Sequence, residues 1–378
     1  MRSILFVVVC TALPLLAACS GAANKPEDAA TDVSADTTAD GPADSRTTCV
    51  PGESWPCGCM QPGCEGVQTC GDEGSEMAPC VCECDGYFGE LPDAEGESVA
   101  PSWDDGVLVA MTFNVMCSMC SNDEGGNEDW EHRVPHIGDV IARYSPDLVG
   151  LQELMFGTEV EQVLEVAPGY QALFPKDLTP NVFGLTEEPD AVILFRADRF
   201  SVQESGFFWL SETPDTDWSG GWATSNLPRV VLWAKLKQTT DGRELYFAST
   251  HFDNNYPNQE MSAPLVLDRL GPWAEGYPLV LVGDFNSKPD SVAYSTLTQG
   301  VDGKGFHFLN AFDLAETWSA VANLEPPPSY DPDHRIDHIF MAGTPTWGCA
   351  WWKVDQFVYG EKDQYPSDHF AMAASLVW

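Results

Sequence analysis

Short apolar runs that end in acidic or amide residues constrain the fold of this chain more than any other feature of its sequence. The run 279–283 leads directly into Asp284 and Asn286, and Asp337 precedes another apolar stretch. A third polar pair, Asp368 and His369, precedes the last strand-like segment. Because strand ends lie along one rim of a sheet, we expect these side chains to converge although they are distant in sequence.

Four more polar residues follow strand-like segments upstream: Asn114, Glu153, His251 and Asp253. Together with the first group they supply hard oxygen and imidazole ligands for a divalent cation, and a base for hydrolysis. Each motif alone is a weak signal, because Asp and Asn also favour turns. The whole set in this order predicts a metal-dependent phosphoesterase.

The hydrophobic pattern predicts an α/β fold in which strands outnumber helices. Helical spacing predicts a helix over 130–144 that ends before Pro146, and a second helix is expected near Ser262 with Pro264 in its first turn. Many strand candidates are apolar throughout, which is typical of sheets covered by other layers. We expect strands at 107–115, 148–151, 191–195, 202–210, 230–236, 245–250, 279–283, 336–341, 350–357 and 370–377.

The N-terminus resembles an export signal. Arg2 precedes the apolar stretch 4–16, which is too short for a membrane span and ends in Leu-Ala-Ala-Cys19. This ending resembles a bacterial lipoprotein signal in which Cys19 becomes the lipidated first residue, and an ordinary cleaved signal is the alternative. We expect an exported protein held by its lipid in the cell envelope, at the outer membrane or cell surface.

Eight cysteines crowd into the segment 49–84. In an exported chain they predict a small disulfide-rich module, with zinc binding as the alternative, and the module could bind a surface partner. Cys117 and Cys120 lie just after the first motif and are followed by the acidic stretch 122–131. The favoured interpretation of this region is a solvated acidic loop, and a local disulfide or a Ca²⁺ site is the alternative. The predicted order is a signal peptide (1–18), a disordered acidic tether (19–48), the Cys-rich module (49–84), a linker (85–105) and the catalytic domain (106–378).

The charge of the chain restricts its partners. The formal net charge is −40, and residues 105–378 carry 40 acidic against 15 basic residues. A surface with this excess of acidic residues repels the phosphate backbone of nucleic acid at long range, which counts against tight, non-specific DNA binding. Some of these acids are expected to be ligands of bound cations.

As a set, the motifs resemble those of the endonuclease/exonuclease/phosphatase superfamily, with its exonuclease and deadenylase-like branch as one neighbour. The resemblance covers 107–378 and implies a four-layer sandwich, in which two mixed β-sheets pack face to face with helices outside. It also implies cleavage of phosphodiesters or phosphomonoesters with one or two Mg²⁺ or Mn²⁺ ions. The motifs that carry it are 112–114, 151–153, 250–253, 283–286, 335–337 and 367–369.

The resemblance and the chemistry together assign metal and base roles. Glu153 is expected to be the principal metal carboxylate, with Asn114 and Asp368 nearby. His369 is expected to act as general base on water, and Asp337 to hold its other ring nitrogen.

Phosphate-binding roles follow in the same way. Asp284 and Asn286 should orient the water and the phosphate, or bind a second metal, and His251 should donate to a phosphate oxygen. Arg229 is a weaker candidate for a phosphate clamp. The polar cluster of Asp253 and Asn254 either contacts the substrate or makes a turn.

The leading function is hydrolysis of phosphodiester bonds in nucleic acid or nucleotides, by a nuclease that could be a 3′–5′ exonuclease. A second hypothesis keeps the chemistry but changes the substrate. The protein would then be a phosphatase or a phospholipase C-like enzyme that acts on sphingomyelin, phospholipid head groups or inositol phosphates. A third is a non-catalytic surface binding protein, against which the complete set of polar residues argues.

Overall fold

The computed structural model describes the strands at 54–57, 64–69 and 81–84 by their backbone, and residues 106–120, 128–223, 227–303, 305–344 and 347–378 in full. The three short strands belong to one compact unit and residues 106–378 to another. The predicted signal peptide, Cys19, the tether and the linker lie outside the described residues. Within the described part of the chain, no helix has the length and apolarity to cross a membrane.

The smaller unit contains a β-sheet, which lies within the Cys-rich segment 49–84. Its strands β1 (Ser54–Cys57), β2 (Cys64–Thr69) and β3 (Val81–Cys84) pair antiparallel in sequence order. The pairing of the cysteines in this segment lies outside what the structure describes.

Two mixed sheets form the centre of the larger unit. The first sheet has the order β13 (Ala315–Val321), β15 (Gly348–Asp355), β16 (Met372–Val377), β4 (Val107–Asn114), β5 (Leu148–Gln152), β7 (Ala191–Arg196) and β6 (Tyr170–Leu173). The second has the order β12 (Leu309–Asn310), β14 (Asp337–Ala342), β11 (Leu279–Asp284), β10 (Glu244–His251), β9 (Val230–Gln238) and β8 (Phe200–Trp209). In each sheet parallel and antiparallel pairs occur together.

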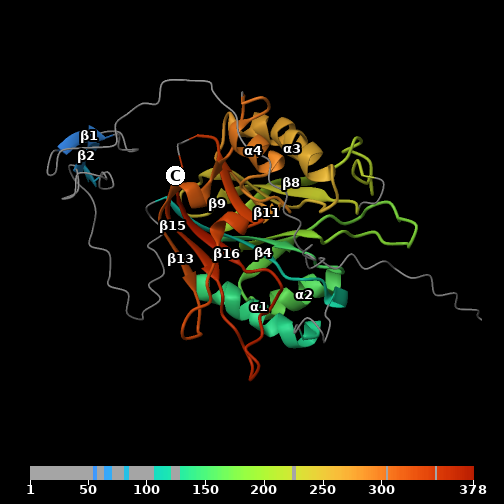
Figure 1. Cartoon of the computed structure of the whole chain (residues 1–378). Coiled ribbons are helices and arrows are strands. Elements are labelled where there is room, and N and C mark those ends of the chain that lie inside the picture. Colours follow the sequence, from blue (N-terminus) through green and yellow to red (C-terminus); the bar gives the residue numbers. More distant parts are fainter. Residues whose placement is uncertain are drawn as a thin grey trace, which may run out of the picture. The chain divides into compact units, whose positions relative to one another are not determined.

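Helices cover the outer face of each sheet, as Figure 1 shows with α1 and α2 on one side of the strands and α3 and α4 on the other. Helices α1 (Trp130–Tyr144) and α2 (Gly157–Val166) share a buried apolar core with the first sheet. Helices α3 (Asn258–Ala274) and α4 (Val292–Gln299) share another core with the second sheet. A third core fills the space between the sheets. The predicted four-layer α/β sandwich is therefore confirmed.

Alternation along the strands decides which side chains face the space between the sheets. In β4, Leu108 and Ala110 belong to the core between the sheets, whereas Met111 and Phe113 pack under the helices. The same alternation in β11 places Val280 and Val282 between the sheets. Residues that continue these alternate positions at the strand ends, such as Asn114 and Asp284, are thereby directed into the same space.

The sequence predicted the strands of both sheets better than the helices. Helix α1 ends where predicted, with Ser145 in the left-handed conformation after Tyr144. The predicted start of α3 near Ser262 is wrong, because the helix begins at Asn258 and Pro264 lies in its interior. The side chain of Asn258 accepts the N–H groups of the loop at 222–223, so tertiary contacts define this helix start. Helices α2 and α4 were not predicted.

Candidate functional site

The candidate active site lies between the two sheets at one end of the strands. In the second sheet, His251 pairs in register with Asp284, and Asp284 pairs with Asp337 on the next strand. These three side chains, at the ends of β10 and β11 and the start of β14, therefore lie side by side. All three are buried. Strand register thus brings together residues that are up to 86 positions apart in the sequence.

The first sheet contributes Asn114 and Glu153 to the same space. Asn114 ends β4 beside the end of β5, after which Glu153 follows. The Asn114 Nδ2 donates to Glu153 Oε1 at 2.9 Å and to Asp284 Oδ2 at 3.1 Å, which joins carboxylates from both sheets. Its Oδ1 accepts the N–H of Met116 at 3.0 Å. Asn114, predicted as a metal ligand, is in this structure the residue that orients two carboxylates.

His369 and Asp337 lie in contact, as the sequence predicted. The ring Nδ1 of His369 is 2.9 Å from Asp337 Oδ2, and its Nε2 is 3.8 Å from Asp284 Oδ2. Burial by itself lowers the pKa of His369, but the carboxylates of Asp337 and Asp284 raise it well above its usual value. A proton that His369 accepts is therefore stabilised by two carboxylates.

The loop that carries His369 also carries Asp368, which is exposed. Ser367 Oγ donates to the Asn114 carbonyl at 2.7 Å and lies 3.4 Å from Asp368 Oδ1. The loop before β16 is thereby fixed to the end of β4. This contact places Asp368 at the rim of the site, where a carboxylate is accessible to a cation.

Asp190 is a site residue that the sequence interpretation missed. It lies just before β7, beside the end of β5, and its Oδ1 accepts the N–H of Glu153 at 3.2 Å. The same oxygen is 2.9 Å from His251 Nδ1, and its Oδ2 accepts from Arg229. Although Asp190 is buried, Arg229 and His251 hold the pKa of its carboxyl below the usual range. Only the antiparallel pairing of β5 with β7 signals this residue, and that pairing is not readable from the sequence.

His251 and Arg229 form one network with Asp190. His251 Nε2 lies 3.5 Å from Asp284 Oδ2, so this ring connects Asp190 to the centre of the site. Burial and the neighbouring Arg229 lower the pKa of His251, but Asp190 and Asp284 outweigh them and raise it. The predicted phosphate clamp Arg229 is largely buried and paired to Asp190, and so it holds this network together.

Asp253 and Asn254, predicted to contact the substrate, occupy different environments. The Asp253 carboxylate is buried and accepts from Leu227 N at 3.2 Å and from Asn258 Nδ2 at 2.6 Å. It therefore organises the loop, which was the alternative interpretation. Asn254 is exposed beside it.

Two of the proposed site residues have left-handed backbone conformations. The φ of Glu153 is 69° and that of Asn286 is 46°. Such conformations are unfavourable for residues other than glycine and cluster at functional sites. The Asn286 N–H donates to Asp284 Oδ1 at 2.8 Å, and its Nδ2 donates to the Phe252 carbonyl at 2.8 Å. These bonds compensate for the strain and hold Asn286 beside Asp284.

The donor set fits a hard divalent cation. Asp284, Asp337 and His369 each offer a ligand atom within one group that could hold a metal. Glu153 is joined to Asp284 through Asn114, and the exposed Asp368 precedes His369, so both can add carboxylates. The buried Oδ1 of Asp337 has no hydrogen-bond partner among the residues that the structure describes. Carboxylate oxygens are the ligands that Mg²⁺ and Mn²⁺ prefer. The residues therefore fit the cation that the sequence predicted.

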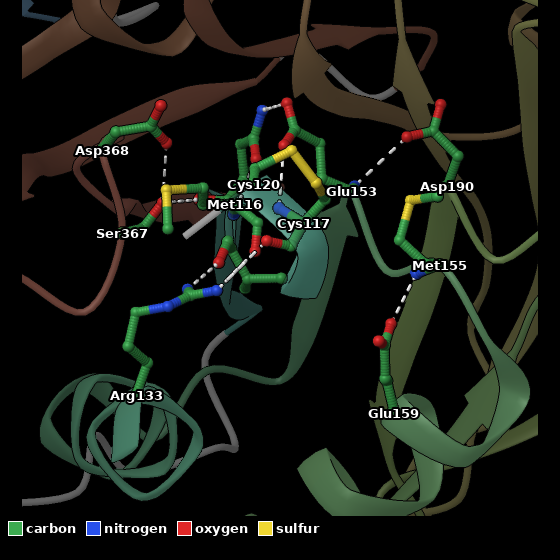
Figure 2. The surroundings of a disulfide bond; sticks show 12 residues. Met116, Cys117, Cys120, Arg133, Glu153, Met155, Glu159, Asp190, Ser367 and Asp368 are labelled. Carbon is green, nitrogen blue, oxygen red and sulfur yellow. Dashed lines mark hydrogen bonds between the residues drawn. A yellow bond between two sulfur atoms is a disulfide. The ribbon is translucent and has the colours of Figure 1, made fainter. Parts of the chain in front are cut away.

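The Cys117–Cys120 pair lies directly against this site. The two residues form a disulfide, so the favoured expectation of a solvated acidic loop is wrong at these positions. Figure 2 shows the disulfide beside Glu153. The only free cysteine among the fully described residues is the buried Cys349.

Comparison with known proteins agrees with this arrangement. The model of the Endonuclease/Exonuclease/phosphatase family matches residues 111–369. The chain belongs to this family. Its members are hydrolases of phosphoester bonds, and the matched range contains all of the motifs from β4 to His369. The superfamily predicted from the sequence is therefore confirmed.

Three relatives illustrate the likeness. A Bacteroides thetaiotaomicron mannosyl-6-phosphatase is 28% identical with a TM-score of 0.61, over 72% of this chain and 100% of that one. A family protein of the same organism is 27% identical with a TM-score of 0.60, over 73% and 99%. Nocturnin of Drosophila melanogaster is 25% identical over 282 residues, 65% of this chain and 42% of that protein. The chain thus spans less than half the length of this curated relative.

Proposed function

We propose that this protein is a divalent-metal-dependent phosphoesterase that acts on small phosphate esters outside the cytoplasm. The observation that carries the proposal is the meeting of Asp284 with Asn114 from the first sheet and with the His369–Asp337 pair. A carboxylate centre, a base and hydrogen-bond donors thereby surround one space between the sheets. These are the groups that hydrolysis of a phosphate ester requires.

The chain's own residues have distinct tasks in this reaction. Asp337 holds His369 Nδ1, so that Nε2 accepts a proton from the attacking water while the carboxylate stabilises the imidazolium. His251, whose pKa the neighbouring Asp190 and Asp284 raise, donates to a phosphate oxygen as negative charge develops. A bound Mg²⁺ or Mn²⁺, held by Glu153 and neighbouring carboxylates, would polarise the phosphoryl oxygen and stabilise the leaving oxygen.

The charge distribution supports a small substrate. Of the fourteen Lys and Arg residues that the structure describes, eight are ion-paired with acids of the protein and Arg133 is bonded to backbone carbonyls, so only five lysines remain to follow a phosphate backbone. The similarity to a mannosyl-6-phosphatase points in the same direction and favours a phosphorylated sugar. The ion-paired residues are Arg143, Arg196, Arg199, Arg229, Lys235, Arg243, Arg269 and Arg335.

Nucleic acid remains the second candidate substrate, because the family includes nucleases. A substrate panel separates the two: hexose 6-phosphates, mononucleotides, single-stranded RNA and DNA, and sphingomyelin, each with Mg²⁺, Mn²⁺ or chelator. We expect release from the small esters, loss of turnover with chelator, and no turnover by His369→Ala. Preferred cleavage of the polynucleotides would favour the nuclease, and full activity in chelator would refute metal dependence.

Export and anchoring are part of the proposal and depend on the N-terminal sequence. If Cys19 carries the lipid, the wild-type protein should fractionate with the cell envelope, and Cys19→Ser should be released from it with unchanged hydrolysis. We also propose that the Cys-rich segment binds a surface partner. Deletion of 49–84 should then reduce surface retention without affecting hydrolysis.

A further inference from the structure

We propose that the turn closed by the Cys117–Cys120 disulfide positions Glu153, so that the affinity of the site for its divalent cation depends on this disulfide. The inference rests on the proposed function insofar as Glu153 is the metal carboxylate. Neither cysteine is a predicted ligand in the oxidised protein. Instead, they fix the backbone turn that orients the Glu153 carboxylate (Figure 2).

The contact between this turn and Glu153 is direct. The N–H of Cys117 donates to Glu153 Oε2 at 2.9 Å. Because Asn114 Nδ2 donates to Oε1, both oxygens of the carboxylate have a fixed donor and the orientation of the group is determined. Partners of this kind orient metal ligands and tune their affinity.

Among the residues that the structure describes, the turn itself has few contacts besides the disulfide. The 3₁₀ turn η2 (Ser118–Cys120) has no buried residue, and Met119 at its centre is 64% exposed. The Cys120 N–H donates to the Cys117 carbonyl at 3.0 Å. Met116, just before the turn, has a φ of 56° and needs external support to keep this conformation. A cross-link between the two ends of the turn supplies this support.

Arg133 holds the same segment from below, as Figure 2 shows. Its guanidinium is fully buried and donates to the carbonyls of Val115 at 2.6 Å and Met116 at 2.9 Å. It also donates to Pro366 at 2.9 Å, in the loop that carries Asp368 and His369. Arg133 therefore fixes the start of the turn to the loop that carries Asp368 and His369, and the disulfide fixes the end of the turn. With the disulfide open, Arg133 still holds the carbonyls of Val115, Met116 and, at 3.3 Å, Cys117, but the side chain of Cys117 is no longer fixed, so the peptide that carries the Cys117 N–H is held on one side only.

The test measures Mn²⁺ binding to the full chain by calorimetry, without substrate. We expect Cys117→Ser/Cys120→Ser to bind Mn²⁺ about 10-fold more weakly than the wild type. Cys349→Ala, which removes the buried free cysteine of β15, is the matched control and should bind as the wild type does. Equal affinity of the double variant and the wild type would overturn the proposal.

Reduction of the wild type provides a second measurement, in which the disulfide is opened in the folded wild-type protein itself. A trialkylphosphine transfers two electrons to the disulfide and is oxidised to its phosphine oxide with oxygen from water, and the two sulfurs leave as thiols. Treatment should weaken Mn²⁺ binding by the same factor in the wild type and leave the double serine variant unchanged. An equal effect on both proteins would assign the change to other disulfides and contradict the proposal.

Glu153→Gln separates failure of this inference from failure of the proposed function. If Glu153 is the metal carboxylate, this variant loses most of its Mn²⁺ affinity. Loss in Glu153→Gln without loss in the double serine variant rejects only the positioning role of the disulfide. Unchanged binding in Glu153→Gln rejects the assignment of the metal site itself.

Discussion

His369 and Asp337 come from different sheets, and the contact of Nδ1 with Oδ2 at 2.9 Å joins the two halves of the site. Asp337 begins β14 of the second sheet, whereas His369 lies in the loop before β16 of the first sheet. The pair therefore forms only when both sheets are packed. Because Asp284 lies next to Asp337 in register, the imidazole is placed against two carboxylates at once.

Asp337→Asn should lower kcat by about 10²- to 10⁴-fold, the range for loss of a general acid–base pair. The amide keeps the shape of the side chain but does not stabilise the imidazolium of His369. Steady-state kinetics at saturating Mg²⁺ measure the effect. The double variant Asp337→Asn/His369→Ala should be no slower than His369→Ala, and additive losses would show that the residues act independently.

Asp190→Asn should destabilise the protein by about 3–5 kcal/mol, because it leaves the buried guanidinium of Arg229 without its charge partner. The matched control is Asp198→Asn, whose partner Arg196 is near the surface and whose loss should cost at most about 1 kcal/mol. Urea unfolding of the three proteins measures both. Similar losses in the two variants would mean that burial adds nothing to the Asp190 pair.

His338 should make stability depend on pH. Burial lowers its pKa to about 3, and the ring stays neutral while its Nε2 contacts the Ser287 carbonyl at 2.8 Å. The unfolded chain takes up a proton below about pH 6.5, whereas the folded chain does not. The contribution of His338 is therefore fully present above pH 6.5 and is lost as the pH falls toward 3, by about 1.4 kcal/mol per pH unit.

His338→Gln, which does not titrate, isolates this contribution. The difference in unfolding free energy between the wild type and the variant should shrink by roughly 1.4 kcal/mol between pH 7.5 and pH 5.5. Urea unfolding at pH 7.5, 6.5 and 5.5 measures it. A constant difference over this range would mean that the folded protein binds the proton as readily as the unfolded chain.

Gly150→Ala should destabilise the packing of the two sheets by about 1–3 kcal/mol. A Cβ at Gly150 in β5 would lie 2.3 Å from Val282 Cγ2 of β11 and 2.8 Å from Ser249 Oγ of β10. The control Gly276→Ala adds a methyl group where no atom lies within 4 Å, and its effect should stay within about 0.5 kcal/mol. Thermal unfolding compares them, and equal stability of both variants would contradict this close approach of the sheets.

Much of the fold could be predicted because strand and helix patterns are local. The apolar runs located the strands that end at Asn114 and Asp284, and the 3.6-residue period located α1 through Tyr144. The start of α3 was wrong because a tertiary contact of Asn258 with another loop decides it. The acidic composition around Cys117 suggested a solvated loop, but the proximity of Cys120 in space closes a disulfide there.

The sequence by itself determined which side chains stand at strand ends and what chemistry they bring, since alternation and composition are properties of each segment. Only the tertiary structure decided which of them meet. Asp190 reaches His251 because β7 pairs with β5, and Asp284 reaches Asn114 because two sheets bury their apolar faces against each other. Strand pairing and sheet packing depend on contacts between distant segments, and no single segment encodes them.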